Sequence, residues 1–114
     1  MSDPLRQHWL HGFLDLCLLS LLAERRDYGG GLADRLALAG FGDVPGGTLY
    51  PSLLRLEQHG LVHTEREASP AGPPRKYYAL TDRGRTTAVE RIEAWGRFRS
   101  QIDAVTAAAV SEPK

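Results

Sequence analysis

The sequence predicts a mostly helical fold with one small β-hairpin and a long C-terminal helix. Three observations predict it. Apolar residues recur at spacings of three and four in three segments before residue 60, which buries one side of a helix. The pattern changes to period two between residues 61 and 80, and helical spacing returns from residue 82 to about residue 109. The chain has 114 residues, enough for one domain with a small core.

The first helix is expected from about Trp9 to Glu24, apolar over most of its circumference. A helix of this kind lies in the centre of a core or is shared with a second subunit. Cys17, the one cysteine, lies in this apolar run, which indicates a buried, inert thiol rather than a nucleophile. A single cysteine fits a reducing cytoplasm, where we expect the protein. The apolar run 13–23 is too short to cross a bilayer and contains Asp15, so no membrane partner is expected.

Candidate sites for a metal or a cofactor are weak. His8, His11 and Asp15 are spaced so that they share a helix face, but no further ligand cluster appears, and we expect no metal site. Residues 25–31 are predicted to form a turn. Its three glycines, Gly29 to Gly31, lack the GxxxxGK[ST] pattern and a preceding strand, so we expect no nucleotide or other cofactor. No catalytic arrangement stands at a usable spacing, and we do not expect an enzyme.

A second, shorter helix is expected from Leu32, and a glycine-rich loop, residues 40–47, connects it to a third helix over residues 48–59. One side of the third helix carries leucines at i, i+4 and i+7. The opposite side is small and polar: Thr48, Pro51, Ser52, Arg55, Gln58 and His59. Such a surface can be matched to the hydrogen-bonding groups of a DNA major groove. An ordinary surface helix has the same pattern, so the neighbouring segments must distinguish a DNA-binding helix from a surface helix.

Residues 61–67 and 75–80 alternate with period two and are predicted to form a hairpin, with a tip at residues 68–74 that is rich in turn formers. Three helices followed by a hairpin are the order of a winged helix-turn-helix. In that fold the third helix enters the major groove and the hairpin reaches the DNA beside it. Arg75 and Lys76 follow the tip, where they would face phosphates; on an ordinary hairpin they would solvate a strand edge.

Thr81 is predicted to cap the last helix. This helix would be roughly 42 Å long at 1.5 Å per residue, and a domain of three short helices cannot cover its whole apolar stripe. We therefore expect a partner helix, most simply from a second copy of the chain. The predicted organisation is a winged helix-turn-helix domain in residues 1–81, a dimerisation helix in residues 82–110 and a disordered tail in residues 111–114.

Taken together, these segments resemble the PadR family of transcriptional regulators over residues 10–100. The resemblance rests mainly on two motifs at their observed separation, Gly47-Thr48-Leu49-Tyr50-Pro51 and Arg75-Lys76-Tyr77-Tyr78-Ala79-Leu80-Thr81-Asp82-Arg83-Gly84.

Two positions depart from the family pattern. Tyr28 precedes the glycine after the first helix instead of following it. Pro45-Gly46 replaces Ser-Pro before the third helix and removes the usual N-cap, so Asp43 or Thr48 is expected to cap that helix instead.

The resemblance implies a homodimeric repressor of the family's short branch, in which the C-terminal helix packs on the first helix of the partner. Four residues of the third helix are expected to contact double-stranded DNA: Thr48, Tyr50, Ser52 and Arg55, with packing against the hairpin as the alternative for Tyr50. Three residues of the hairpin are expected to hold phosphate: Arg75, Lys76 and Tyr77. A twofold axis would place the third helices about 34 Å apart on a palindromic operator.

Some members of the short branch bind flat aromatic compounds between paired tryptophans at the dimer interface, and Trp95 matches the surroundings of that tryptophan. The resemblance thus implies a small aromatic effector at a site formed by Trp95, Phe98, Ile92, Leu14 and Asp15. Packing in the dimer core is the alternative role for Trp95.

A second function stays open. Lys and Arg number 14 and so do Asp and Glu, so the formal net charge is zero, which argues against a protein that simply coats nucleic acid. With a weakly basic third helix, this charge also fits a helical, dimeric protein-interaction module that does not touch DNA. Salt-dependent, sequence-selective DNA binding distinguishes the two functions.

Overall fold

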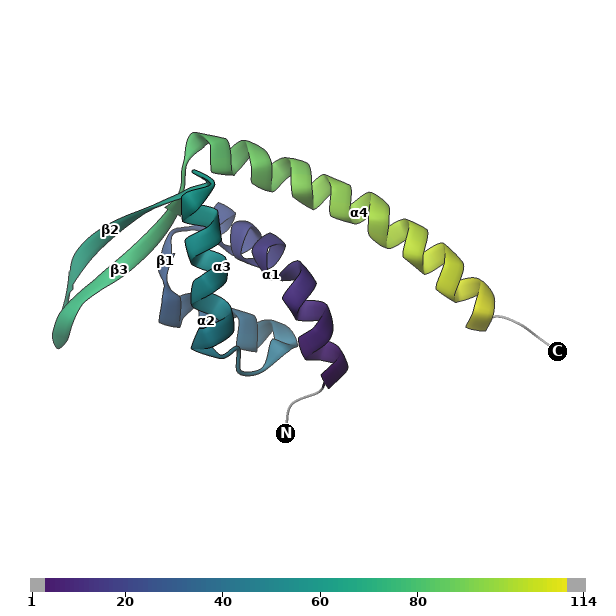
Figure 1. The fold of residues 1–114 in the computed structure, drawn as a ribbon, viewed down its shortest axis with the longest axis horizontal. Helices are drawn as coiled ribbons and strands as arrows, with labels where there is room; N and C mark the ends of the chain where they lie inside the picture. Colours follow the sequence, from purple (N-terminus) through teal and green to yellow (C-terminus); the bar gives the residue numbers. More distant parts are fainter. Residues whose placement is uncertain (1–3, 111–114) are drawn as a thin grey trace.

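The computed structural model describes residues 4–110, apart from the side chains of residues 4–8 and 11. The predicted tail, residues 111–114, lies outside the described residues. The fold is mostly helical with a small antiparallel sheet, which confirms the predicted class (Figure 1). In chain order its elements are α1 (Pro4–Glu24), β1 (Asp27–Tyr28), α2 (Gly29–Leu36), the π-helical turn η1 (Ala37–Phe41), α3 (Gly46–Gln58), β2 (Val62–Ser69), β3 (Gly72–Leu80) and α4 (Asp82–Val110).

The core is built by leucines from the first three helices. Eight of them have at most 2% of their surface exposed: Leu14, Leu18, Leu19, Leu32, Leu36, Leu49, Leu53 and Leu56. Burial of one such side chain contributes about 1.5–3 kcal/mol. Tyr78 and Leu80 of β3 extend this core onto one face of the sheet, and burial raises the pKa of the Tyr78 phenol. The inner face of the sheet is therefore fixed against the helices.

The sheet has three strands in the order β1-β3-β2, not the two predicted. The hairpin is also longer than predicted: β2 and β3 stay paired as far as Ser69 and Gly72, so only residues 70 and 71 turn at the tip. Strand β1 pairs Asp27 with Tyr78 and Tyr28 with Tyr77. Two residues are too few to create a period-two pattern, so β1 was not predictable from alternation.

The glycines predicted to form a turn instead form the first turn of α2. Close approach explains two of them. A Cβ on Gly31 would stand 2.1 Å from a carboxylate oxygen of Asp27, and a Cβ on Gly29 would stand 2.4 Å from the hydroxyl of Tyr50. Glycine lets both side chains lie against the start of α2.

Helix α3 begins at Gly46, two residues earlier than predicted, and the predicted capping residues are wrong. Pro45 occupies the N-cap position, and its carbonyl accepts hydrogen bonds from the N–H groups of Thr48 and Leu49, both at 2.9 Å. Within the described residues, no side chain caps this end of α3. The extended conformation that proline favours sets the entry to the helix.

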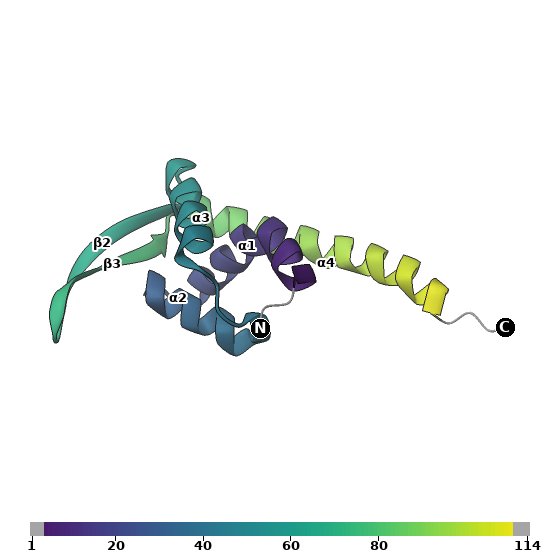
Figure 2. The same ribbon diagram turned by 60° about the horizontal axis from the view of Figure 1, so that its bottom comes forward.

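Helix α4 confirms the predicted cap and length. The Thr81 hydroxyl accepts a hydrogen bond from the Gly84 N–H at 2.9 Å and donates one to the Gly60 carbonyl at 2.7 Å. The helix begins against the core and then extends past it, so its far part and the β2–β3 hairpin project from opposite sides of the molecule (Figures 1 and 2). Residues 4–110 contain no helix that could span a bilayer.

Candidate nucleic-acid interface

The exposed face of α3 differs from the predicted one. Four residues point directly away from the core, because they lie opposite its buried side: Gly47, Pro51, Leu54 and Gln58. Leu54 is 52% exposed. The predicted outward placement is right for Pro51, Arg55 and Gln58 and wrong for Ser52, which is only 2% exposed. Ser52 follows Leu49 by three residues and precedes Leu56 by four, so it lies on the leucine side of α3, where its small side chain packs inward.

Ser52 and Arg55 form one unit with α1. Arg55 donates hydrogen bonds through Nη2 to the Ser52 hydroxyl at 2.8 Å and to the Asp15 carboxylate at 3.0 Å. The Arg55 side chain remains 49% exposed. Arg55 therefore lies at the flank of the exposed face, and its hydrogen bond to the buried Ser52 helps to fix its orientation.

Tyr50 and Thr48 occupy the two edges of the exposed face. The Tyr50 ring lies over the backbone of Gly29 and beside Gly46, so the contact that orients it is the start of α2. It is still 49% exposed. Thr48 is partly buried. About half of the Tyr50 side chain therefore stays accessible beside the start of α3.

The hairpin next to α3 carries its cations on both faces. Residues alternate along β3, so Lys76 lies on the same face as the buried Tyr78, with its ammonium nitrogen 5.6 Å from the ring centroid. Arg66 of β2 pairs with Lys76 in the strand register. Both are exposed, and they lie on the face of the hairpin that packs against the helices nearer its base, where β2 contacts α3.

Arg75 and Tyr77 lie on the outer face of the hairpin. The Arg75 guanidinium stands 4.4 Å from the ring centroid of Tyr28 on β1, and the rings of Tyr28 and Tyr77 meet edge to face at 5.6 Å. The two cations predicted to hold phosphate, Arg75 and Lys76, therefore lie on opposite faces of the hairpin. Their contacts with phosphate stay predictions.

Arg26 neutralises the acidic side chains of this outer face. It forms ion pairs with Glu65 at 3.1 Å and with Glu67, and its guanidinium lies 4.7 Å from the ring centroid of Tyr77. The hydrogen bond to Glu67 raises the pKa of Arg26. Arg26 thus connects the segment after α1 to both strands of the hairpin.

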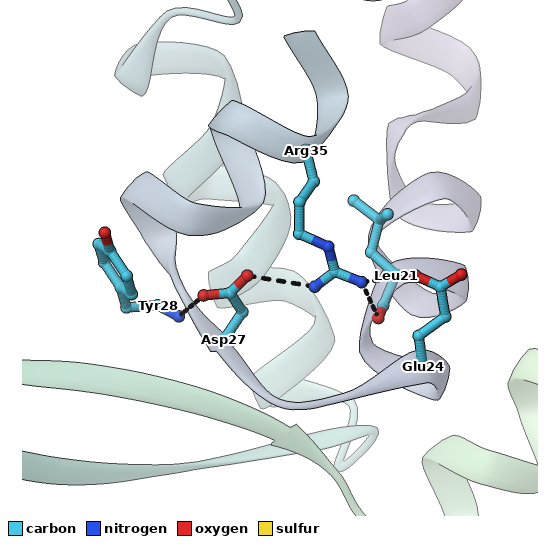
Figure 3. Close-up of polar contacts among 5 residues, drawn as sticks. All are labelled: Leu21, Glu24, Asp27, Tyr28 and Arg35. Carbon is cyan, nitrogen blue, oxygen red and sulfur yellow. Dashed lines mark hydrogen bonds and ion pairs between the residues drawn. The ribbon is translucent and has the colours of Figure 1, made fainter. Parts of the chain in front are cut away.

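A second arginine fixes α2 against α1 (Figure 3). Arg35 donates to Asp27 at 3.1 Å, to the Leu21 carbonyl at 2.8 Å and to Glu24 at 2.7 Å. Asp27 also accepts the N–H of Tyr28. The Arg35 and Asp27 side chains are 11% and 13% exposed. These contacts join α2 to the C-terminal end of α1 and fix the position of β1, the strand that pairs with β3 of the hairpin.

An apolar pocket of about 270 Å³ lies between α1, η1 and α4. It is lined by Trp9, Leu10, Phe13, Leu16, Cys17, Phe41 and Trp95. The rings of Trp95 and Phe13 meet edge to face at 4.9 Å. Cys17 is half-buried here, less than predicted, and desolvation raises the pKa of its thiol. The thiol therefore stays protonated at neutral pH.

The residues expected to bind an effector are only partly brought together. Phe98 lies beside Trp95 on α4 with ring centroids 6.3 Å apart, and Ile92 is exposed on the same helix. Leu14 is 1% exposed in the core, and Asp15 is paired with Arg55, so neither lines the pocket. The effector site was predicted between two copies of the chain, so the roles of Leu14 and Asp15 there stay predictions.

Sequence reasoning missed Arg66 and Leu54. A two-residue turn alone would place Arg66 opposite Arg75. The irregularity between Glu67 and Ser69 shifts the register and places Arg66 opposite Lys76, so its position was not predictable from the turn length. The exposure of Leu54 was not predicted, because a leucine in an amphipathic helix is normally assigned to the core. His8 and His11, the other members of the weak metal pattern, have side chains outside the described residues; among those described, no group of three possible metal ligands occurs.

The comparison with known proteins agrees with this fold. The family model described as "Transcriptional regulator PadR-like family" matches residues 18–90. A PadR-like transcriptional regulator from Bacillus cereus is 33% identical, with a TM-score of 0.77 over 87% of this chain and 96% of its own. A PadR family regulator from Eggerthella lenta is 33% identical, with a TM-score of 0.74 over 90% and 85%. An uncharacterised protein from Lysinibacillus sphaericus is 26% identical over 86% of this chain and 92% of its own.

These matches cover most of the winged helix-turn-helix and part of α4, and family members are regulators of transcription rather than enzymes. The chain therefore belongs to the PadR-like family of transcriptional regulators.

Proposed function

We propose that the protein is a homodimeric repressor that binds a palindromic operator through α3 and the β2–β3 hairpin. One observation carries the proposal: the exposed face of α3 lies beside a hairpin whose exposed cations are Arg66, Arg75 and Lys76. Cations of this kind bind phosphates and set the register of a reading helix. The formal net charge of zero leaves this local cluster as the source of electrostatic affinity.

Within this proposal the contact residues have separate roles. Thr48, Tyr50 and Arg55 reach DNA from α3, and Ser52 acts by holding Arg55 in place. Lys76 contacts phosphate on the side of the hairpin that faces α3, together with Arg66. Arg75 and Tyr77 contact the backbone from the outer face.

The dimer is supported by the uncovered apolar residues of α4. Phe98 is 48% exposed, Ile102 40% and Val105 74%, whereas the buried residues of this helix, Gly84 and Ala88, lie near its start. A soluble chain rarely leaves such a stripe bare. A second copy, related by a twofold axis, would cover it and place the two α3 helices on successive turns of the major groove.

A response to a small aromatic effector is the least constrained part of the proposal. The apolar pocket beside Trp95 supports it, since its lining offers aromatic surface to a flat ligand. A ligand changes DNA affinity only to the extent that it binds the DNA-bound and free forms unequally.

The test is DNA binding measured by fluorescence anisotropy over a range of salt concentrations. We expect log K to fall linearly with log salt, and Arg66→Ala and Lys76→Ala each to reduce the slope by about one. Arg97→Ala, an exposed arginine on α4, is the matched control and should leave the slope unchanged. Binding that neither depends on salt nor distinguishes DNA sequences would favour the protein-interaction module.

A further inference from the structure

We infer that α3 recognises thymine through the C5 methyl groups that project into the major groove, using Leu54 and Pro51. This inference rests on the proposed function and adds the chemical basis of its specificity. The residues of α3 that lie opposite its buried side are largely apolar, although they are exposed to solvent in the free protein.

The geometry follows from the buried side of the helix. At 100° per residue, the buried positions Leu49, Ser52, Leu53 and Leu56 leave an opposite direction centred on Gly47, Pro51, Leu54 and Gln58. These four fall within an arc of about 60°. Two side chains that hydrogen-bond, Tyr50 and Arg55, lie at the margins of this arc.

Tyr50 and Arg55, at the margins of this arc, are also restrained by contacts within the protein. Arg55 is held by Asp15 and Ser52, and Tyr50 lies against Gly29. In contrast, Leu54 is half-exposed on a helix whose other three leucines all pack into the core. Leu54 is therefore free to contact a ligand without disturbing the fold.

The chemistry of this face selects one kind of base edge. Arginine or lysine aimed at the groove would read guanine, whereas apolar side chains contact the thymine methyl group. Gly47 has no side chain, so the helix can approach the base edges closely near its N-terminal end, the end that reads bases in helix-turn-helix proteins. Gln58, next along the arc, can form paired hydrogen bonds with adenine. The face is thus matched to A·T pairs.

The test replaces thymine with deoxyuridine at single positions of the selected operator. Deoxyuridine lacks the methyl group and keeps every hydrogen-bonding group, so it isolates this contact. We expect one or two positions in each half-site at which the change weakens binding about fourfold per methyl group, the value for burying one such group. Substitutions elsewhere in the operator should have no effect.

Leu54→Ala supplies the second arm. It should weaken binding to the thymine operator by a similar factor and abolish the difference between thymine and deoxyuridine at one of those positions. Leu38→Ala removes a leucine of η1 that is more exposed than Leu54, 87% against 52%, and should preserve the difference. Circular dichroism confirms that both variants fold.

Specific binding that is unaffected by deoxyuridine at every position would overturn the inference and leave the proposed function standing. So would a full deoxyuridine effect retained in both Leu54→Ala and Pro51→Ala. Absence of any sequence-selective DNA binding would instead overturn the proposed function, and this inference with it.

Discussion

At the scale of single residues, two arginine–aspartate pairs show how surroundings set a role. Arg55 pairs with Asp15 at 3.0 Å but keeps 49% of its side chain exposed, so it remains available at the flank of α3. Arg35 pairs with Asp27 at 3.1 Å with 11% exposed and also binds a backbone carbonyl. The first pair orients a contact residue. The second holds the fold together.

Arg35→Ala should therefore reduce the free energy of unfolding by about 2 kcal/mol, because it removes the ion-pair partner of the mostly buried Asp27 carboxylate and one hydrogen bond to the Leu21 carbonyl. Urea denaturation should show a lower midpoint with an unchanged slope. Arg85→Ala, an exposed arginine on α4, should change stability by less than about 0.5 kcal/mol. Equal losses in the two variants would contradict the role given to Arg35.

At the scale of elements, the hairpin depends on a segment that is not part of it. Arg26 bonds Glu65 and Glu67 on β2 and lies over Tyr77 on β3, while β1 pairs with β3. The charge and the direction of the hairpin are therefore set from the end of α1.

Arg26→Ala should weaken DNA binding about threefold to tenfold at low salt, because it exposes two carboxylates near the phosphates. The triple variant that also carries Glu65→Gln and Glu67→Gln should recover most of the affinity. Anisotropy titration measures both. If removing the carboxylates restored nothing, Arg26 would act by another route than neutralising them.

Helix positions and the hairpin were predictable from the sequence, because leucine spacing and period-two alternation are local signals. Two features were not. Strand β1 exists only through its pairing with β3, and position 29 has to be glycine because the Tyr50 ring lies against it. Each is decided by tertiary contacts between distant segments. The predicted outward position of Ser52 was wrong, and the DNA and effector contacts of the candidate residues stay predictions.

At the scale of the whole molecule, the described part measures 62 × 35 × 20 Å, far from spherical, because α4 extends beyond the core (Figure 2). The β2–β3 hairpin and the far part of α4 lie toward opposite ends of this long shape (Figures 1 and 2). A dimer built on α4 would join two copies while leaving both hairpins free.

Ile102→Asp should convert a dimer into a monomer, since it puts a charge into the apolar stripe of α4. Size-exclusion chromatography with light scattering gives the mass directly. Ser100→Asp adds the same charge to an exposed position about 160° around the helix from Ile102 and should leave the dimer intact. A wild-type protein that is monomeric at micromolar concentration would contradict the proposed assembly.

We propose that this chain binds a specific DNA sequence as a twofold dimer. Selection of bound fragments from a random pool of double-stranded DNA tests it most directly. We expect enrichment of a palindrome whose half-sites are centred about 34 Å, or one turn, apart, with A·T pairs in each half-site. Enrichment of an asymmetric single site would contradict the dimer, and no enrichment of any sequence would contradict the claim itself.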